Sequence, residues 1–101
     1  MPVETPIRLH PEADDELHVI ADWYDEHGGN GDEFLAAAER TVEGIAAAPW
    51  RWPVVNSVTP PTRRRLIAGH QYSVFYRIDH DGVLIVAIAH QSREPLYWRG
   101  R

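Results

Sequence analysis

The chain of 101 residues contains no cysteine. This absence excludes disulfide bridges, a thiol nucleophile and every zinc or iron–sulfur site that needs thiolate ligands. No apolar run reaches the roughly 18 residues of a membrane-spanning helix. The N-terminal stretch has neither the basic region nor the long apolar region of a secretory signal. We therefore expect a cytoplasmic protein with no membrane partner.

Lysine is also absent, because all ten basic residues are arginine. Residues 1–48 hold two arginines and twelve acidic residues, whereas residues 49–101 hold eight arginines and three acidic residues. Guanidinium groups match the geometry of phosphate and carboxylate groups. The second half of the chain therefore predicts a surface for a polar partner. The alternative is that the two halves neutralise each other in the fold.

The composition is that of a globular protein, with 44% apolar and 25% charged residues. At this length the chain corresponds to one domain, which we expect to span residues 1–101. No internal repeat or low-complexity linker divides it.

A helical hairpin is predicted between Pro11 and Pro49, a stretch without proline. Pro11 suits the first turn of a helix, and acidic residues follow it. The glycine-rich residues 28–31 end this helix, and Asp32 is the expected N-cap of the next. Matching apolar faces and a short loop indicate that the two helices pack antiparallel. The first face comprises Ala13, Leu17, Ile20, Ala21 and Tyr24, and the second comprises Phe34, Ala38, Thr41, Val42 and Ile45.

Four strands are predicted around this hairpin. A short strand covers Ile7–His10, where apolar and polar residues alternate between two prolines. Three more follow at Thr62–Ile67, Tyr72–Asp79 and Val83–His90, with a tight hairpin turn before the last. The last strand is almost wholly apolar, which predicts a central position covered on both faces. The predicted fold class is α+β: an N-terminal strand, an antiparallel helical hairpin and a three-stranded antiparallel meander, all strands in one sheet.

Three consecutive arginines stand in the second predicted strand. Because side chains alternate across a strand, Arg63 and Arg65 share one face and Arg64 points to the other. We expect Arg63 and Arg65 to bind a target or nucleic acid, with Arg77 on the neighbouring strand as a third phosphate contact. The alternative is that these side chains pair with helix carboxylates or protect a sheet edge from aggregation.

A second constellation closes the chain: His90 at the end of the last strand, Arg93, and Tyr97 in the tail. Cleavage of RNA needs a proton acceptor, a proton donor and a cation beside the phosphate, and these side chains match such roles. His90 and Arg93 are also candidate contacts to a target or nucleic acid. The alternative is that His90 hydrogen-bonds the backbone, while Tyr97 and Trp98 fill the core.

No metal or cofactor is predicted. The six histidines show no metal-ligand spacing, and no carboxylate motif accompanies them. The chain also has no glycine-rich phosphate-binding loop and no serine nucleophile motif.

The segments LHPEADDELHVIADWYDEHG, RRLIAGHQYSVFYRID and VLIVAIAHQSREPLYW resemble the RelE/ParE toxin superfamily over nearly the whole chain. The opening HPEADDEL pattern and the YRI tripeptide, followed by an apolar strand that ends in His90 and then Arg93, carry the resemblance. The resemblance implies a toxin of a type II toxin–antitoxin module with the element order β–α–α–β–β–β. It also implies a cognate antitoxin whose C-terminal segment binds the toxin as helix and strand.

The resemblance implies two mechanisms. RelE-like members cleave mRNA on the ribosome without a metal, whereas ParE-like members inhibit DNA gyrase. The chain has no lysine and has Ser73 where a RelE-like arginine is expected, and Arg65, Arg93 and Tyr97 are the candidates to replace the catalytic set. We therefore expect a ParE-like toxin that inhibits growth by binding gyrase. The alternatives are an mRNA endoribonuclease and a non-toxic member that only binds a partner.

Overall fold

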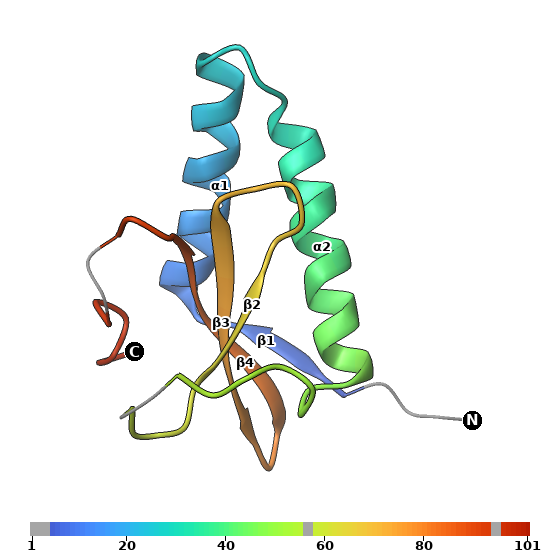
Figure 1. The fold of residues 1–101 in the computed structure, drawn as a ribbon, viewed down its shortest axis with the longest axis vertical. Helices are drawn as coiled ribbons and strands as arrows, with labels where there is room; N and C mark the ends of the chain where they lie inside the picture. The colour runs from blue at the N-terminus through green and yellow to red at the C-terminus, as the bar shows by residue number, and fades with distance from the viewer. Residues whose placement is uncertain (1–4, 56–57, 94–95) are drawn as a thin grey trace.

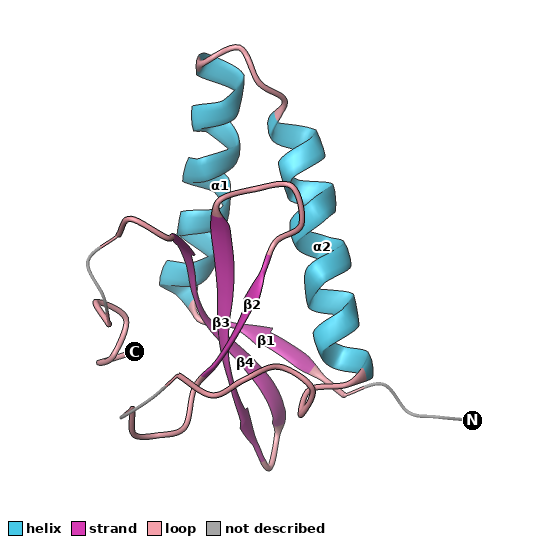
Figure 2. Cartoon of the chain, in the orientation of Figure 1, coloured by secondary structure: helices cyan, strands magenta, loops and turns pink. Residues whose placement is uncertain are grey.

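The computed structural model describes residues 5–55, 58–93 and 96–101. Over these residues the chain forms two helices and one four-stranded sheet, and Figures 1 and 2 show the helices as a hairpin beside the sheet. The predicted α+β class is confirmed. The elements in chain order are β1 (Ile7–Leu9), α1 (Pro11–Glu26), α2 (Gly31–Ala47), β2 (Arg63–Leu66), β3 (Tyr72–Asp79) and β4 (Gly82–His90).

The sheet has the strand order β1-β4-β3-β2. The predicted meander is confirmed, because β3 pairs antiparallel with both β2 and β4. β1 lies parallel to β4, so the complete sheet is mixed. The apolar strand β4 is central, as its sequence predicted, and only the two short strands β1 and β2 occupy the sheet edges.

α1 begins as predicted, with Pro11 as its first residue and His10 as its N-cap. The prediction of Asp32 as the cap of α2 is wrong. Asn30 takes the extended backbone of a cap, and its side-chain oxygen accepts the N–H of Glu33 at 3.1 Å. Neither helix is long and apolar enough to cross a membrane, and the same holds throughout the described residues.

α2 begins at Gly31, one residue before Asp32, because a glycine fits at this position. Gly31 is buried, and a Cβ there would overlap the carbonyl oxygen of Ala21 in α1. Its N–H also donates to the Asp25 carboxylate at 2.8 Å. The glycine therefore lets α2 start directly against α1, which closes the hairpin.

Two apolar clusters cover the two faces of the sheet. The larger joins the predicted stripes of both helices to the inward side chains of β3 and β4. On the opposite face, Trp98 is only 1% exposed, and its ring centroid lies 5.0 Å from that of Phe75 in β3. Trp98 packs there with Val58, Val86 and Ala87. The prediction that β4 is covered on both faces is confirmed.

Candidate functional site

Arg63 and Arg65 share one sheet face, as predicted, and that face looks toward the helices. Arg63 donates to the backbone carbonyls of Trp50 and Trp52, at 3.2 and 2.6 Å. Arg65 donates to the carbonyl of Thr41 in α2 at 2.8 Å, and its guanidinium lies 4.1 Å from the ring centroid of Trp52. Both side chains are half-buried. They therefore tie α2 and the loop after it to the sheet.

Arg77, the expected third phosphate contact, does not share this face. Arg63 pairs with Tyr76, and the alternation of β3 turns the next residue, Arg77, to the opposite face. Arg77 is 8% exposed there, and burial lowers the pKa of its guanidinium. It donates to the Thr62 hydroxyl at 3.1 Å and to the Arg101 carbonyl at 2.5 Å. Arg77 is therefore a buried residue whose hydrogen bonds hold the C-terminal segment against the sheet.

A hollow of about 200 Å³ lies on the sheet face away from the helices. It brings together His90, Arg93 and Tyr97, which the sequence pattern had grouped, and adds Arg64 from β2. Arg65 is not among its residues. Arg65, which contacts α2, is thus separated from Arg93 and Tyr97, the other two predicted catalytic residues. The sequence held a signal for the place of Arg64. Side chains alternate along β2, so Arg64 points to the face opposite Arg63 and Arg65.

Tyr97 is held by groups on two sides within this hollow. The Arg93 guanidinium lies 4.1 Å from its ring centroid. Its hydroxyl donates to the Glu16 carboxylate in α1 at 2.5 Å. Burial, and then the hydrogen bond and negative charge of Glu16, raise the pKa of Tyr97 well above its usual value of 10.0. At neutral pH the Tyr97 hydroxyl therefore keeps its proton, and it already donates this proton to Glu16.

Glu16 was missed by the sequence reasoning. Its carboxylate also accepts from the Arg101 side chain at 2.8 Å and from the backbone N–H of Ile88 at 3.1 Å. A signal existed, because Glu16 follows Ala13 by three residues and precedes Ile20 by four. That spacing places a charged residue on the buried stripe of α1.

His90 matches the alternative of a histidine that bonds the backbone. Its Nδ1 accepts the N–H of Ser92 at 3.0 Å, and its Nε2 lies 3.2 Å from the Gln71 side-chain oxygen. Across the described ranges, no three His, Cys, Asp or Glu side chains are grouped as a metal site would require.

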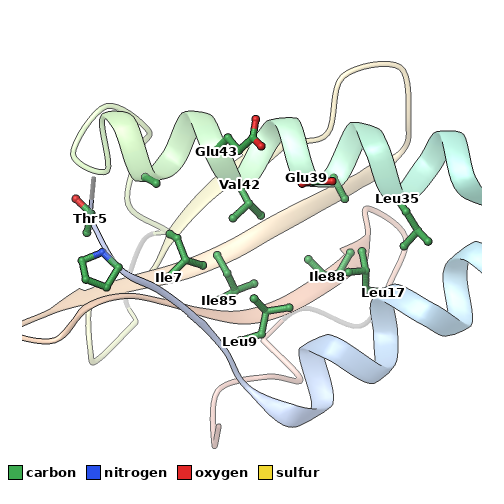
Figure 3. Close-up of a pocket in the computed structure, with 13 residues that line it drawn as sticks. Thr5, Ile7, Leu9, Leu17, Leu35, Glu39, Val42, Glu43, Ile85 and Ile88 are labelled. Carbon is green, nitrogen blue, oxygen red and sulfur yellow. The ribbon is translucent and has the colours of Figure 1, made fainter. Parts of the chain in front are cut away.

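A larger apolar groove of about 640 Å³ opens between α2 and the β1 side of the sheet (Figure 3). In Figure 3, side chains from α2 and from the sheet face one another across it, and Leu17 reaches in from α1. Glu39 and Glu43 of α2 are its acidic members. The apolar lining comprises Pro6, Ile7, Leu9, Leu17, Leu35, Ala38, Val42, Ala46, Ile85 and Ile88.

Comparison with protein-family models matches residues 7–95 to the family described as ParE toxin of type II toxin-antitoxin system, parDE. The matched span contains all six helices and strands named above and ends before Tyr97. Comparison with the curated proteins gave no match.

Proposed function

The chain belongs to the ParE toxin family of type II toxin–antitoxin systems, and from this premise we propose that it inhibits growth by binding an essential target in the cytoplasm. DNA gyrase is the proposed target, because it is the one that resemblance to ParE-like toxins implies. A cognate antitoxin neutralises the toxin in this proposal. The module then serves to stabilise the plasmid or genome segment that encodes it.

We favour target binding over RNA cleavage because the predicted catalytic residues are separated in the fold. Arg65 faces α2 and donates to a carbonyl of its own chain, whereas Arg93 and Tyr97 line a hollow to which Arg65 does not contribute. A general base for RNA cleavage works best with a pKa near the operating pH. The Tyr97 hydroxyl has a raised pKa and already donates to Glu16. These features support a docking surface.

The proposed target-facing surface is the hollow on the face away from the helices. Arg64 and Arg93 stand exposed at this hollow, and neither side chain has a hydrogen bond to any described residue. Exposed guanidiniums bind carboxylates in a two-pronged geometry and steer charged partners. We assign Arg64 and Arg93 the contacts to the target, beside His90.

The apolar groove in Figure 3 is the proposed antitoxin site. A groove of this kind accepts an amphipathic helix through apolar side chains one turn apart. Glu39 and Glu43 favour basic residues on the polar side of that helix. The antitoxin thus binds a surface separate from Arg64 and Arg93.

Induced expression without any partner tests the proposal, with DNA and protein synthesis followed by separate pulse labels. We expect DNA synthesis to fall first, and the purified protein to inhibit supercoiling by gyrase. The double variant Arg64→Glu, Arg93→Glu should lose both effects. Arg40→Glu in α2 is the matched control, because Arg40 is an exposed arginine outside both cavities. Unimpaired growth at full expression would contradict the toxin proposal and leave a non-toxic binding member.

A second candidate function is ribosome-dependent cleavage of mRNA. One observation favours it: Arg93 stacks on Tyr97 in the same hollow as His90. In that case protein synthesis falls first, and Tyr97→Phe or Arg93→Ala abolishes cleavage while the fold is retained. Cleavage that persists in both variants removes these residues from the reaction.

A further inference from the structure

A small hollow of about 240 Å³ lies where the turn between β2 and β3 meets α1. Its lining comprises Trp23 and Tyr24 from α1, Gly69, His70 and Gln71 from the turn, and Tyr72 and His90 from the ends of β3 and β4. Among the described residues it shares none with the apolar groove of Figure 3, and only His90 with the proposed target surface. The proposed function therefore leaves this hollow without a role.

Three aromatic rings in this lining stand at steep angles to one another. The planes of Trp23 and Tyr24 make an angle of 84°, and their centroids lie 5.6 Å apart. The planes of Tyr24 and Tyr72 make an angle of 61°, with the centroids 6.3 Å apart. Trp23 is 49% exposed, so its ring is accessible from solvent. A flat ligand can stack in parallel on only one such ring, whereas a compact, rounded group can contact all three.

Neighbouring side chains hold these three rings in place. The His27 ring stacks on Trp23, with the centroids 4.2 Å apart and the planes inclined by 16°. Phe34 of α2 packs against both tyrosines, at centroid distances of 5.3 Å to Tyr24 and 5.5 Å to Tyr72. Rings that are already ordered lose little conformational entropy when a ligand binds. The hollow is thus a preorganised site.

The surroundings of the hollow favour a positively charged ligand. Among the described residues, no arginine, aspartate or glutamate lines it. Asp22 and Glu26 are exposed in the same stretch of α1. Burial, then Tyr72 and the negative charge of Glu33, raise the pKa of Tyr24. Aromatic rings also present negative faces. An anion is therefore disfavoured here, and a cation is attracted.

The polar side chains of the hollow are largely paired with one another. The Tyr24 hydroxyl lies 2.9 Å from Nδ1 of His70, and the side-chain oxygen of Gln71 lies 3.2 Å from Nε2 of His90. A primary ammonium brings three N–H donors that need acceptors when they leave water. An ammonium that carries methyl groups needs none, and its charge is attracted to the faces of tryptophan and tyrosine rings.

We propose that this hollow binds a methylated ammonium group, the charged end of a small organic cation of the choline type. Trp23, Tyr24 and Tyr72 contact the methyl groups, and their ring faces stabilise the charge. Asp22 and Glu26 attract the cation from solution. A trimethylated lysine side chain carries the same group, so the experiments below compare a free cation with one attached to a peptide.

NMR titration of the full chain tests this site, with the indole N–H of Trp23 and the ring signals of Tyr72 as reporters. The probe is choline, and its matched control is dimethylbutanol, the neutral isostere in which a carbon atom replaces the nitrogen. We expect choline to bind about tenfold more tightly, because only the charged ligand gains the cation–π attraction. Equal binding of both ligands, or an absence of shifts with choline, would overturn the proposal.

A short peptide that contains one trimethylated lysine distinguishes the two sources of the group. Binding of this peptide about tenfold more tightly than choline would assign the site to a modified side chain of a partner. Equal or weaker binding would assign it to the free cation. The same peptide with unmodified lysine should bind about tenfold more weakly than the trimethylated one, since its N–H groups lose water without gaining acceptors.

Trp23→Ala should weaken choline about tenfold, and Trp23→Phe, which keeps an aromatic ring, should weaken it less. Trp50→Ala is the matched control, because Trp50 is 70% exposed and lies outside the hollow. Thermal melts of the three variants verify that the fold is intact. Unchanged binding in Trp23→Ala would overturn the proposal. Displacement of choline by adenosine would also overturn it, because a flat base would then be the preferred ligand. Since the purified chain is measured, neither result depends on whether it is toxic.

Discussion

The hydroxyl of Tyr97 donates to the carboxylate of Glu16 over 2.5 Å, although 81 residues separate the two in sequence. The same carboxylate receives the Arg101 guanidinium and the free N–H of Ile88 in β4. Arg101 in turn donates to the carbonyl of Val86 at 3.0 Å. One acidic side chain thus joins α1, the C-terminal segment and the stretch of β4 that the short strand β1 leaves uncovered.

Removal of this carboxylate should destabilise the fold. Glu16 and Arg101 have side chains only 16% and 12% exposed, so Glu16→Ala removes the buried partner of a largely buried cation and leaves it only the exposed Glu12. We expect the free energy of unfolding in urea to fall by about 3 kcal/mol. The control is Glu12→Ala, because Glu12 contacts the same Arg101 but is 62% exposed. That variant should lose less than about 1 kcal/mol, and equal losses would contradict the buried role of Glu16.

Tyr97 should make the stability of the protein depend on alkaline pH. Its pKa is raised in the fold above the ordinary 10.0, first by burial and then by Glu16. Above pH 10 the unfolded chain loses this proton while the folded chain keeps it, so stability falls as pH rises further. Tyr97→Phe should remove that part of the fall in unfolding curves measured from pH 8 to 11. Identical pH profiles for both proteins would argue against the Glu16 bond.

Trp98 should be a core residue in energy as well as in position. It is 1% exposed, and we expect Trp98→Ala to lower the free energy of unfolding by about 3–5 kcal/mol. Trp23 in α1 is 49% exposed, and Trp23→Ala is the matched truncation. Its effect should be clearly smaller. A mild effect of Trp98→Ala would mean that the C-terminal segment contributes little to the core.

Gly44 and Arg65 should be energetically coupled. Alanine is a better helix former than glycine by about 1 kcal/mol. In this fold, however, a Cβ at residue 44 would overlap the Arg65 guanidinium and displace it from the Thr41 carbonyl. Gly44→Ala should therefore stabilise the Arg65→Ala protein more than the parent. A double-mutant cycle in urea measures this difference. If the two changes in the free energy of unfolding were additive, the Arg65 guanidinium would not contact Gly44.

A charge placed in the apolar groove should weaken binding of the antitoxin and leave the target surface unchanged. Leu9 lines the groove and is 38% exposed, so Leu9→Glu places a carboxylate there without burying it completely. We expect this variant to remain toxic but to escape rescue by the co-expressed antitoxin. Val19→Glu is the control, because Val19 in α1 is 65% exposed and lies outside the groove. Full rescue of Leu9→Glu would place the antitoxin elsewhere.

The helices and strands were predictable because their signals are local. Proline and glycine limited the helical hairpin, and apolar spacing identified the stripes that the structure buries. The cap of α2 was the exception. Asn30 and Asp32 are both good caps by residue type, and the contact of Gly31 with α1 decided between them.

The amino-acid sequence by itself determined the element order, the central place of β4 and the grouping of His90 with Arg93 and Tyr97. Period and proximity along the chain suffice for each of these features. Only the tertiary structure decided what the arginines do. Side-chain alternation predicted that Arg63 and Arg65 share a face, but it did not predict that this face packs against α2. It also did not predict that Arg77 is buried beneath the C-terminal segment. Contacts such as Glu16 with Tyr97 join residues far apart in sequence, and no local pattern encodes which distant partners meet.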